Sequence, residues 1–372
     1  MTGLTKAAFA PDTSQPHFSG SFDPHDVHIL LKPSAIQHVD VAEKERMIQS
    51  GTKHYSEMLS PEKVPDARYR MLYHAALERN AGRLRGDIET LARGITARPE
   101  TQRSCVIISL ARAGTPIGVL LKRALERISI VAHHYSISII RGRGIDRNAL
   151  QYIFDRHGAE QAIFLDGWTG KGAIRQELDK SVEETGLGFQ PFLAVVADPA
   201  GQASLAATTE DYVIPSGLLN GIVSGLISRS VLTRELVGPD DFHACLFQQE
   251  HRQYDITNAF LTAIEAAPVE SSLSQWSLAI ASDAKARCQS LLDDLTRECG
   301  ISDVNRIKPG IAEATRAILR RVPDKVFVRD MADPEIQHMR HLASQSGVDI
   351  VERDLLNYRA VTIIKKLGGD QE

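Results

Sequence analysis

Residues 162–173 read Ala162-Ile163-Phe164-Leu165-Asp166-Gly167-Trp168-Thr169-Gly170-Lys171-Gly172-Ala173. The apolar start predicts a buried parallel strand, and residues 174–185 predict a helix that follows the turn. Gly170 and Gly172 let backbone N–H groups approach an anion, and the Thr169 hydroxyl adds a donor. The helix begins near Ala173 and directs the positive end of its dipole at the same point. We interpret this stretch as an anion-binding turn.

Length and composition indicate a globular protein of about two domains. The chain has 372 residues, of which 43% are hydrophobic and 24% charged, and its formal net charge is −4. That charge gives no bulk attraction to nucleic acid, so any such contact requires a local patch. Four cysteines without metal-binding spacing predict a reducing compartment. There is no apolar leader and no run approaching 18 apolar residues, so we expect a cytoplasmic protein.

Short apolar segments alternate with helical segments from Cys105 onward, which predicts an α/β fold with a parallel sheet and helices on both faces. Strands are expected at residues 105–110, 128–140, 162–165, 192–197 and 212–214, and helices at 41–58, 67–95, 148–157 and 220–232. A small α/β unit closes the chain. We expect an N-terminal extension with a helical cap at 1–100, a core at 101–265, a helical connector at 266–302 and the C-terminal unit at 303–372.

A second polar turn, Ala111-Arg112-Ala113-Gly114-Thr115, follows the strand at 105–110. Because parallel strands present their carboxyl ends to a shared crevice, this turn and the turn at Thr169 should face one ligand. Arg141 and Arg143 lie between glycines and predict a mobile cationic loop, with an exposed basic turn as the alternative. Asp198 at the end of the strand at 192–197 is a further candidate for substrate contact.

The strand, acid and Thr/Gly turn resemble the loop of type I phosphoribosyltransferases that binds 5-phosphoribosyl-1-pyrophosphate (PRPP), although Gly167 replaces the second acid of that loop. The resemblance implies that Asp166 holds the ribose or a hydrated metal ion, that Arg112 binds pyrophosphate, and that Arg141 or Arg143 closes the site. It also implies that Mg²⁺ is held mainly by PRPP. The implied substrate-binding residues are Ala111, Ala113, Gly114, Thr115, Gly167, Thr169, Gly170, Lys171, Gly172, Ala173 and Asp198. A plain strand-to-helix turn is the alternative.

The segment Asp240-Asp241-Phe242-His243-Ala244-Cys245 suggests a different chemistry. A cysteine hydrolase with Cys245 as nucleophile is an alternative function. Catalytic cysteine and histidine usually meet across a fold, so the partner would be a distant residue such as His25 or His134.

The run Lys308-Pro309-Gly310-Ile311-Ala312-Glu313-Ala314-Thr315-Arg316, followed by Asp330 and Gly347, resembles the Pelota/ribosomal L7Ae class of RNA-binding domains. The resemblance implies RNA contacts by Lys308, Gly310, Glu313 and Arg316. An oligomerisation domain without RNA contact, in a homo-oligomer, is the alternative.

Several segments together extend the resemblance over nearly the whole chain: Gly20-Ser21-Phe22, Leu110 to Pro116, His134 to Ile137, Asp166 to Gly172 and Ala197 to Gly201. They resemble a bacterial phosphoribosyltransferase-like family of tellurium-resistance and stress operons, also labelled the StiP cysteine protease family, that carries a C-terminal Pelota-type domain. This resemblance implies transfer of a phosphoribosyl group from PRPP to an unknown base, giving a ribonucleoside-type product. The cysteine hydrolase and an RNA-binding protein without catalysis are the two alternatives.

Overall fold

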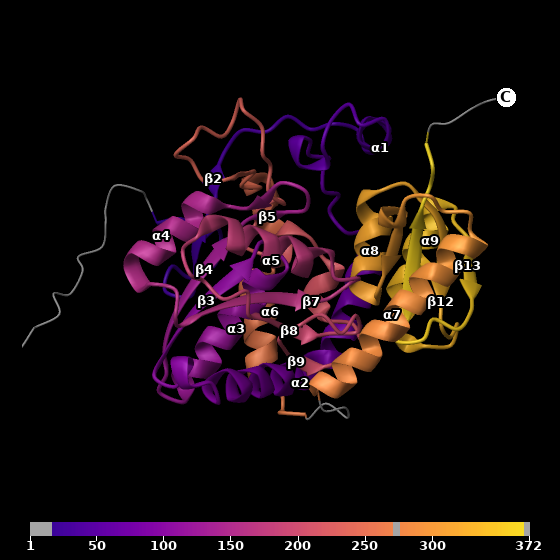
Figure 1. Ribbon diagram of the computed structural model, residues 1–372. Coiled ribbons are helices and arrows are strands. Elements are labelled where there is room, and N and C mark those ends of the chain that lie inside the picture. The colour runs from indigo at the N-terminus through magenta and orange to yellow at the C-terminus, as the bar shows by residue number, and fades with distance from the viewer. Residues whose placement is uncertain (1–16, 271–275, 368–372) are drawn as a thin grey trace, which may run out of the picture.

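The computed structural model describes residues 17–270 and 276–367 (Figure 1). Within these residues, the central sheet has six parallel strands in the order β1-β4-β3-β7-β8-β9. The strands are β1 (His28–Leu30), β3 (Ser104–Leu110), β4 (Val131–Ile137), β7 (Ala162–Trp168), β8 (Leu193–Ala197) and β9 (Leu205–Thr208). The predicted parallel α/β sheet is therefore confirmed. Parts of the expected regions 1–100, 266–302 and 303–372 lie outside the described residues.

Helices cover both faces of this sheet, because successive side chains of each strand point to opposite faces. Cys105 and Ile107 of β3 pack in one cluster with α2 (Ala67–Thr96), α3 (Gly114–Arg127) and α6 (Thr257–Ala266). Val106 and Ile108 pack in a second cluster with α4 (Arg147–His157) and α5 (Ala173–Thr185). The carboxyl ends of β3 and β7 are thus fixed between two packed layers, and α3 and α5 begin directly after them.

Shorter elements surround the core. They are β2 (Lys32–Pro33) paired with β10 (Ala244–Cys245), the hairpin of β5 (Ile139–Ile140) and β6 (Gly144–Ile145), α1 (Val41–Gln49), and the 3-10 helices η1 (Tyr55–Glu57), η2 (Pro99–Thr101), η3 (Pro215–Leu218), η4 (Gly221–Val223), η5 (Gln249–Tyr254), η6 (Val304–Arg306) and η7 (Pro334–Ile336).

The C-terminal unit is a small α/β sheet with helices, drawn in gold and yellow beside the core in Figure 1. It contains β11 (Ile307–Pro309), α8 (Ile311–Arg320), β12 (Pro323–Val328), α9 (Gln337–Ser346), β13 (Ile350–Glu352) and β14 (Ala360–Ile364), with the strand order β11-β14-β12-β13. The helix α7 (Leu278–Glu298) packs on this sheet, since Leu291 and Leu295 share a cluster with Phe327 and Ile363. We therefore propose that α7 belongs to the C-terminal unit rather than to a separate connector.

The expected helix at 220–232 is wrong. Within it the structure has only the short 3-10 helix η4, because Leu226 and Gly225 take positive φ angles of 58° and 76°, which an α-helix does not allow. The chain turns back at Gly225, whose carbonyl accepts a hydrogen bond from the N–H of Ser21 at 3.1 Å. The expected strand at 212–214 is likewise absent from the described chain, and the helix expected at 41–58 already ends at Gln49.

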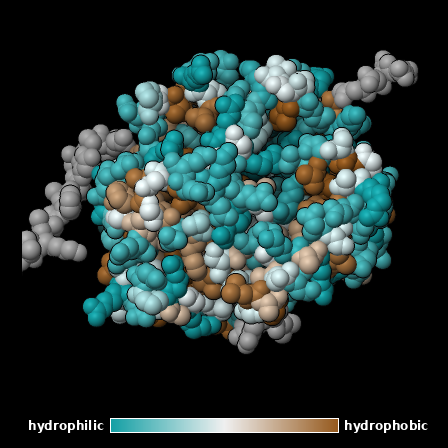
Figure 2. All heavy atoms as spheres, in the orientation of Figure 1, coloured by the Kyte–Doolittle hydropathy of each residue, from teal (hydrophilic) through white to brown (hydrophobic). Residues whose placement is uncertain are grey.

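Hydrophilic residues cover most of the face shown in Figure 2. Among the helices of residues 17–270 and 276–367, none combines the length and apolar character that crossing a membrane requires.

Candidate functional site

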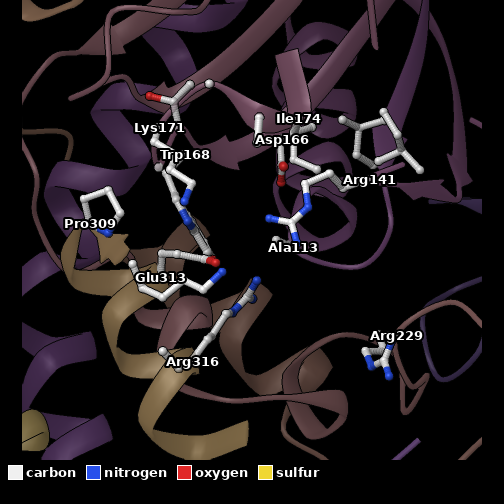
Figure 3. A pocket seen from close by; sticks show the side chains of 18 of the residues that line it. Ala113, Arg141, Asp166, Trp168, Lys171, Ile174, Arg229, Pro309, Glu313 and Arg316 are labelled. Carbon is white, nitrogen blue, oxygen red and sulfur yellow. The ribbon is translucent and has the colours of Figure 1, made fainter. Parts of the chain in front are cut away.

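The two predicted anion-binding turns line one cavity of about 350 Å³, which we call the cationic pocket. Residues 111–113 after β3 and residues 169–174 after β7 form its core side. Lys308, Glu313 and Arg316 from the C-terminal unit form the opposite side. In Figure 3, Glu313 and Arg316 extend from α8 toward Trp168 while Asp166 points in from the core. Both units of the protein therefore contribute to a single site.

The first turn is organised around the guanidinium of Arg112. This group pairs with both carboxylate oxygens of Glu62 and donates to the carbonyl of Ile227 at 2.7 Å. Burial favours the neutral form of Glu62, but the charges of Arg112 and Arg320 outweigh it and lower the pKa of Glu62 to about 2. Arg112 thus enters the pocket with part of its charge already neutralised.

The remaining residues of this turn build the start of α3. Ala111 and Ala113 line the pocket, whereas Gly114 and Thr115 do not. Gly114 packs closely against the backbone of Leu165, and the Thr115 hydroxyl hydrogen-bonds Ser136 Oγ at 2.7 Å. These contacts fix where the helix begins.

The second turn begins with a carboxyl group inside β7. Asp166 Oδ1 accepts the N–H of Gly167 at 2.8 Å. Burial raises the pKa of Asp166 to about 7, which outweighs the lowering effects of that hydrogen bond and of Arg316. Gly167 is buried and lies outside the pocket lining. A carboxyl group that titrates near neutrality at the end of a strand can give or take a proton.

Asp198 supports the second turn from behind. It lies outside the pocket lining, and its Oδ1 accepts the Thr169 hydroxyl at 2.6 Å and the N–H of Gln202 at 2.8 Å. Gly172 has φ 87° and precedes α5 without a side-chain cap, so the first N–H groups of α5 stay available to a ligand. Thr169, Gly170, Lys171, Gly172 and Ala173 all line the pocket.

The expected cationic loop is the turn of the β5-β6 hairpin. Arg141 lines the pocket, where its N–H donates to the Tyr55 hydroxyl at 2.8 Å and its guanidinium donates to Asn305 Oδ1 at 2.9 Å. Arg143 lies outside the lining and pairs with Glu57 at 2.7 Å. Both arginines are therefore tied to neighbouring elements.

The four predicted RNA contacts are not a free surface. Lys308, Glu313 and Arg316 line the pocket, and the Arg316 guanidinium stacks 4.4 Å from the Trp168 ring centre. Gly310 has φ 92° and precedes α8, where the N–H of Ile311 donates to both carboxylate oxygens of Asp211 at 3.0 Å. The start of α8 thus already holds a carboxylate of the core.

Several residues that line the pocket were not predicted from the sequence. They are Lys44, Tyr55, Arg175, Arg229, Arg320 and Arg321. A signal existed for Arg320, which lies four residues after Arg316 and therefore on the same face of α8. For Lys44 and Arg229 no local pattern pointed to a site, because they reach it from distant parts of the chain.

Cys245 lies in β10, fully buried, and burial raises the pKa of its thiol to about 12. His243 Nδ1 hydrogen-bonds Ser138 Oγ at 2.8 Å, and His134 Nε2 hydrogen-bonds Ser109 Oγ at 2.8 Å. His25 is exposed. The described contacts do not bring a histidine to the Cys245 thiol.

Cys288 is placed differently. Its Sγ lies 3.0 Å from the hydroxyl of Tyr358, and this hydroxyl donates to the carbonyl of Gly170 at 2.7 Å. Burial raises the pKa of Cys288, while the Tyr358 hydrogen bond and the charge of Lys171 act in the opposite direction. Among the four cysteines, all of which lie in the described residues, Cys288 is the one that a hydrogen-bonded residue, Tyr358, connects to the pocket.

Within the described residues there is no group of three or more His, Cys, Asp and Glu that could hold a metal ion. Of the two pocket carboxyl groups, Glu313 lies among the charges of Lys308, Arg316, Arg320 and Lys171, and Asp166 lies near that of Arg316. The expectation of Mg²⁺ stays a prediction, and we derive no step through it.

Comparison with known proteins gives two family matches. A family described as "Tellurite-like stress resistance cysteine protease StiP" matches residues 20–265, and one described as "PELOTA RNA binding domain" matches residues 286–366. A curated relative from Acinetobacter baylyi, named "Cysteine protease StiP", is 42% identical over 366 residues, which cover 94% of this chain and 95% of the relative.

Among solved structures, a hypoxanthine phosphoribosyltransferase from Trypanosoma cruzi in complex with IMP is 14% identical with a TM-score of 0.27, covering 35% of this chain and 77% of that chain. An HGPRT-ase from Leishmania tarentolae in complex with GMP is 8% identical with a TM-score of 0.25, covering 41% and 85%. Likeness at these scores says nothing further about the reaction.

These comparisons confirm the resemblance to the StiP and Pelota families, but the predicted function is wrong. The matching family and the curated relative are both named for a cysteine protease, so the chain is not assigned as a phosphoribosyltransferase that uses PRPP. The physical reason is that glycine turns at helix starts bind the oxyanions of many ligands, and such turns therefore do not specify a reaction.

Proposed function

This chain belongs to the StiP family of tellurite-like stress resistance proteins, and from that membership we propose that it is a cysteine-dependent peptide hydrolase of a stress response. The observation that carries the proposal is the 42% identity, over 94% of the chain, to a relative named as a cysteine protease. All four cysteines are free, which fits the cytoplasmic location that we also propose.

We propose Cys288 as the nucleophile in place of Cys245. The thiolate form attacks, and Cys245 is buried in a strand with its pKa raised to about 12. Cys288 contacts Tyr358, which hydrogen-bonds the pocket turn at Gly170. Cys288 is buried as well, and burial also raises the pKa of its thiol, so its contact with Tyr358 beside the pocket turn is what distinguishes it from Cys245.

The chemistry follows the general thiol mechanism. The Cys288 thiolate attacks the peptide carbonyl carbon, a thioester forms, and the leaving amine takes up the proton that the thiol gave up. Water then cleaves the thioester and restores the thiol.

The test compares the full-length protein with its four single Cys→Ala variants in a peptide-hydrolysis assay and in labelling by a thiol-directed inhibitor. We expect Cys288→Ala to lose activity by about 100-fold or more, because it removes the nucleophile. Cys299→Ala is the exposed control and should keep the wild-type rate. Absence of hydrolysis in the wild type, or full activity of Cys288→Ala at an unchanged melting temperature, contradicts the proposal.

A second proposed function is RNA binding by the C-terminal unit. The match of residues 286–366 to the Pelota RNA-binding family supports it. The predicted RNA contacts stay Lys308, Gly310, Glu313 and Arg316. Because three of them line the pocket between the two units, we expect the core to restrict access of RNA to them.

A further inference from the structure

The cationic pocket contains far more positive than negative charge. Its lining includes ten basic side chains: Lys44, Arg112, Arg141, Lys171, Arg175, Arg229, Lys308, Arg316, Arg320 and Arg321. The carboxyl groups in the same lining are Asp166 and Glu313. Three further carboxylates, Glu45, Glu62 and Asp179, pair with lining arginines. Five acidic groups therefore face ten basic groups, and buried charge without a partner is unfavourable.

Donor groups within the pocket also lack partners. Within the described residues, Nε of Arg112, Nη1 of Arg229 and Nε of Arg316 are buried without a hydrogen-bond acceptor. The guanidinium of Arg316 stacks on the face of the Trp168 ring. Such a cation–π contact leaves the N–H groups of the guanidinium, which point outward in its own plane, free to donate to an acceptor in the pocket. Burial together with the charge of Arg112 lowers the pKa of Arg316 to about 10, as expected for crowded cations.

Backbone donors add to this excess. Helices α3 and α5 both begin at the pocket wall, next to Ala113 and Ala173, and neither has a side-chain hydrogen bond at its N-cap. The start of α5 presents free N–H groups and the positive end of a helix dipole. At the start of α3 the N–H of Thr115 donates to the carbonyl of Arg112 at 3.2 Å and Pro116 has no N–H, so that helix contributes its dipole alone. The α5 start and the unpartnered guanidinium N–H groups together favour a ligand with at least two anionic groups.

The pocket already shows how it binds carboxylates. Glu62 places both oxygens on Arg112, and Glu45 places both oxygens on Arg321. These are the paired guanidinium–carboxylate contacts that a glutamate or aspartate of a bound peptide would make.

We propose that the cationic pocket binds two or more acidic side chains of a peptide substrate, held jointly by the core and by α8 of the C-terminal unit. The substrate class is thus an acid-rich peptide segment, and naming it a substrate rests on the proposed hydrolase function. Arg316 and Arg320 are the specificity-determining residues contributed by the C-terminal unit.

The test separates binding from cleavage. The full-length Cys288→Ala chain is titrated with three fluorescent peptides that differ at two neighbouring positions, Glu-Glu, Gln-Gln or Lys-Lys, and wild-type cleavage of the same peptides is measured in parallel. We expect the Glu-Glu peptide to bind at least about tenfold more tightly than the Gln-Gln peptide, with the Lys-Lys peptide weakest. High salt should reduce the difference.

Variants at the pocket locate the effect. Arg316→Gln and Arg320→Gln should each weaken Glu-Glu binding by about fivefold or more, and Arg316→Lys should restore part of it. Arg340→Gln, an exposed arginine of α9 outside the pocket, is the matched control and should bind as the parent does. Melting temperatures identify a variant that fails to fold, and the second pocket variant then carries the test.

The outcomes distinguish the two proposals. Tight Glu-Glu binding without cleavage supports the acidic-peptide pocket and counts against the hydrolase. Cleavage without preference for Glu-Glu supports the hydrolase and overturns the pocket proposal. Direct binding of inorganic pyrophosphate that is lost in Arg320→Gln, while none of the peptides binds, also overturns it and makes the pocket a phosphate site.

Discussion

The carboxyl group of Asp166 shows how one residue acquires its properties from both units of the protein. Its position at the carboxyl end of β7 follows from the sequence, and so does its proximity to the turn at Thr169. Its pKa does not, because the shift depends on burial at the pocket wall and on the charges of Glu313 and Arg316. These groups lie about 150 residues further along the chain.

Asp166→Asn should stabilise the protein at alkaline pH. Burial raises the folded-state pKa to about 7, so the stability gained from the bound proton is complete below the unfolded value of 3.8 and is lost as pH rises to about 7. Asparagine keeps the acceptor for Gly167 and has no charge to bury. We expect a gain on the order of 1–2 kcal/mol at pH 8 and little change at pH 4.

Melting temperatures of both proteins at pH 4, 6 and 8 measure this effect. Asp155→Asn, at an exposed position of α4, is the control and should follow the wild-type curve. An identical pH dependence in Asp166→Asn and wild type would show that Asp166 ionises normally.

The sequence alone could not identify which cysteine lies near the pocket. Cys245 attracted attention because His243 is two residues away in the sequence, yet that histidine bonds Ser138. Cys288 had no neighbouring motif, since its partner Tyr358 is contributed by a loop 70 residues later. Contacts made across a fold leave no local pattern, so sequence spacing could point to Cys245 but could not indicate Cys288.

At the scale of elements, hydrophobic periodicity predicted the strands and helices that are held by packing of apolar side chains. Strands β3, β7 and β8 and helices α2 and α4 lie within a few residues of their expected bounds, because each is an apolar run or a repeating apolar face. Strands β9 and β14 were missed. Leu205–Thr208 has weak apolar character, and Ala360–Ile364 is recognisable only once its partner strands are known.

Thr169→Val should loosen the turn between β7 and α5. The hydroxyl of Thr169 donates to Asp198 and accepts the N–H of Ala200 at 3.2 Å, so valine removes one of the donors to Asp198 and leaves the N–H of Ala200 without its acceptor at nearly unchanged volume. We expect a loss of about 1–3 kcal/mol in the free energy of unfolding, the range for unsatisfied buried polar groups. Hydrogen exchange at residues 169–173 should become faster.

Thr52→Val, at an exposed position before η1, is the matched control. Unchanged exchange at residues 169–173 in Thr169→Val would mean that backbone contacts alone hold the turn.

At the scale of the whole molecule, ion pairs and hydrogen bonds fasten the C-terminal unit to the core. Glu335 accepts from Arg79 and Asn80 of α2 and from the N–H of Val213, and Arg321 pairs with Glu45 of α1. Both the family and the α/β class were recognisable from sequence, but this docking was not, because its partners lie more than 100 residues apart. The pocket that results was therefore predictable only on its core side.

This docking predicts that RNA binding by the C-terminal unit is suppressed in the intact chain. Asp211 of the core holds the N–H of Ile311 at the start of α8, the place where a phosphate would bind, and Lys308 and Arg316 face the pocket. Asp211→Ala should release this helix start. We expect retention of a single-stranded RNA on a filter to rise about threefold or more at 50 mM salt and to fall again at 200 mM.

Removing any acidic residue makes the protein less negative, so the increase has meaning only against a charge-matched control. Asp324→Ala removes one exposed carboxylate from β12 without touching α8. If the two variants retain equal RNA at equal folded fractions, general electrostatics explains the gain, and the start of α8 is not an RNA contact. If only Asp211→Ala responds, a core carboxylate occupies the RNA-binding position, and RNA and the docked core compete for the same helix start.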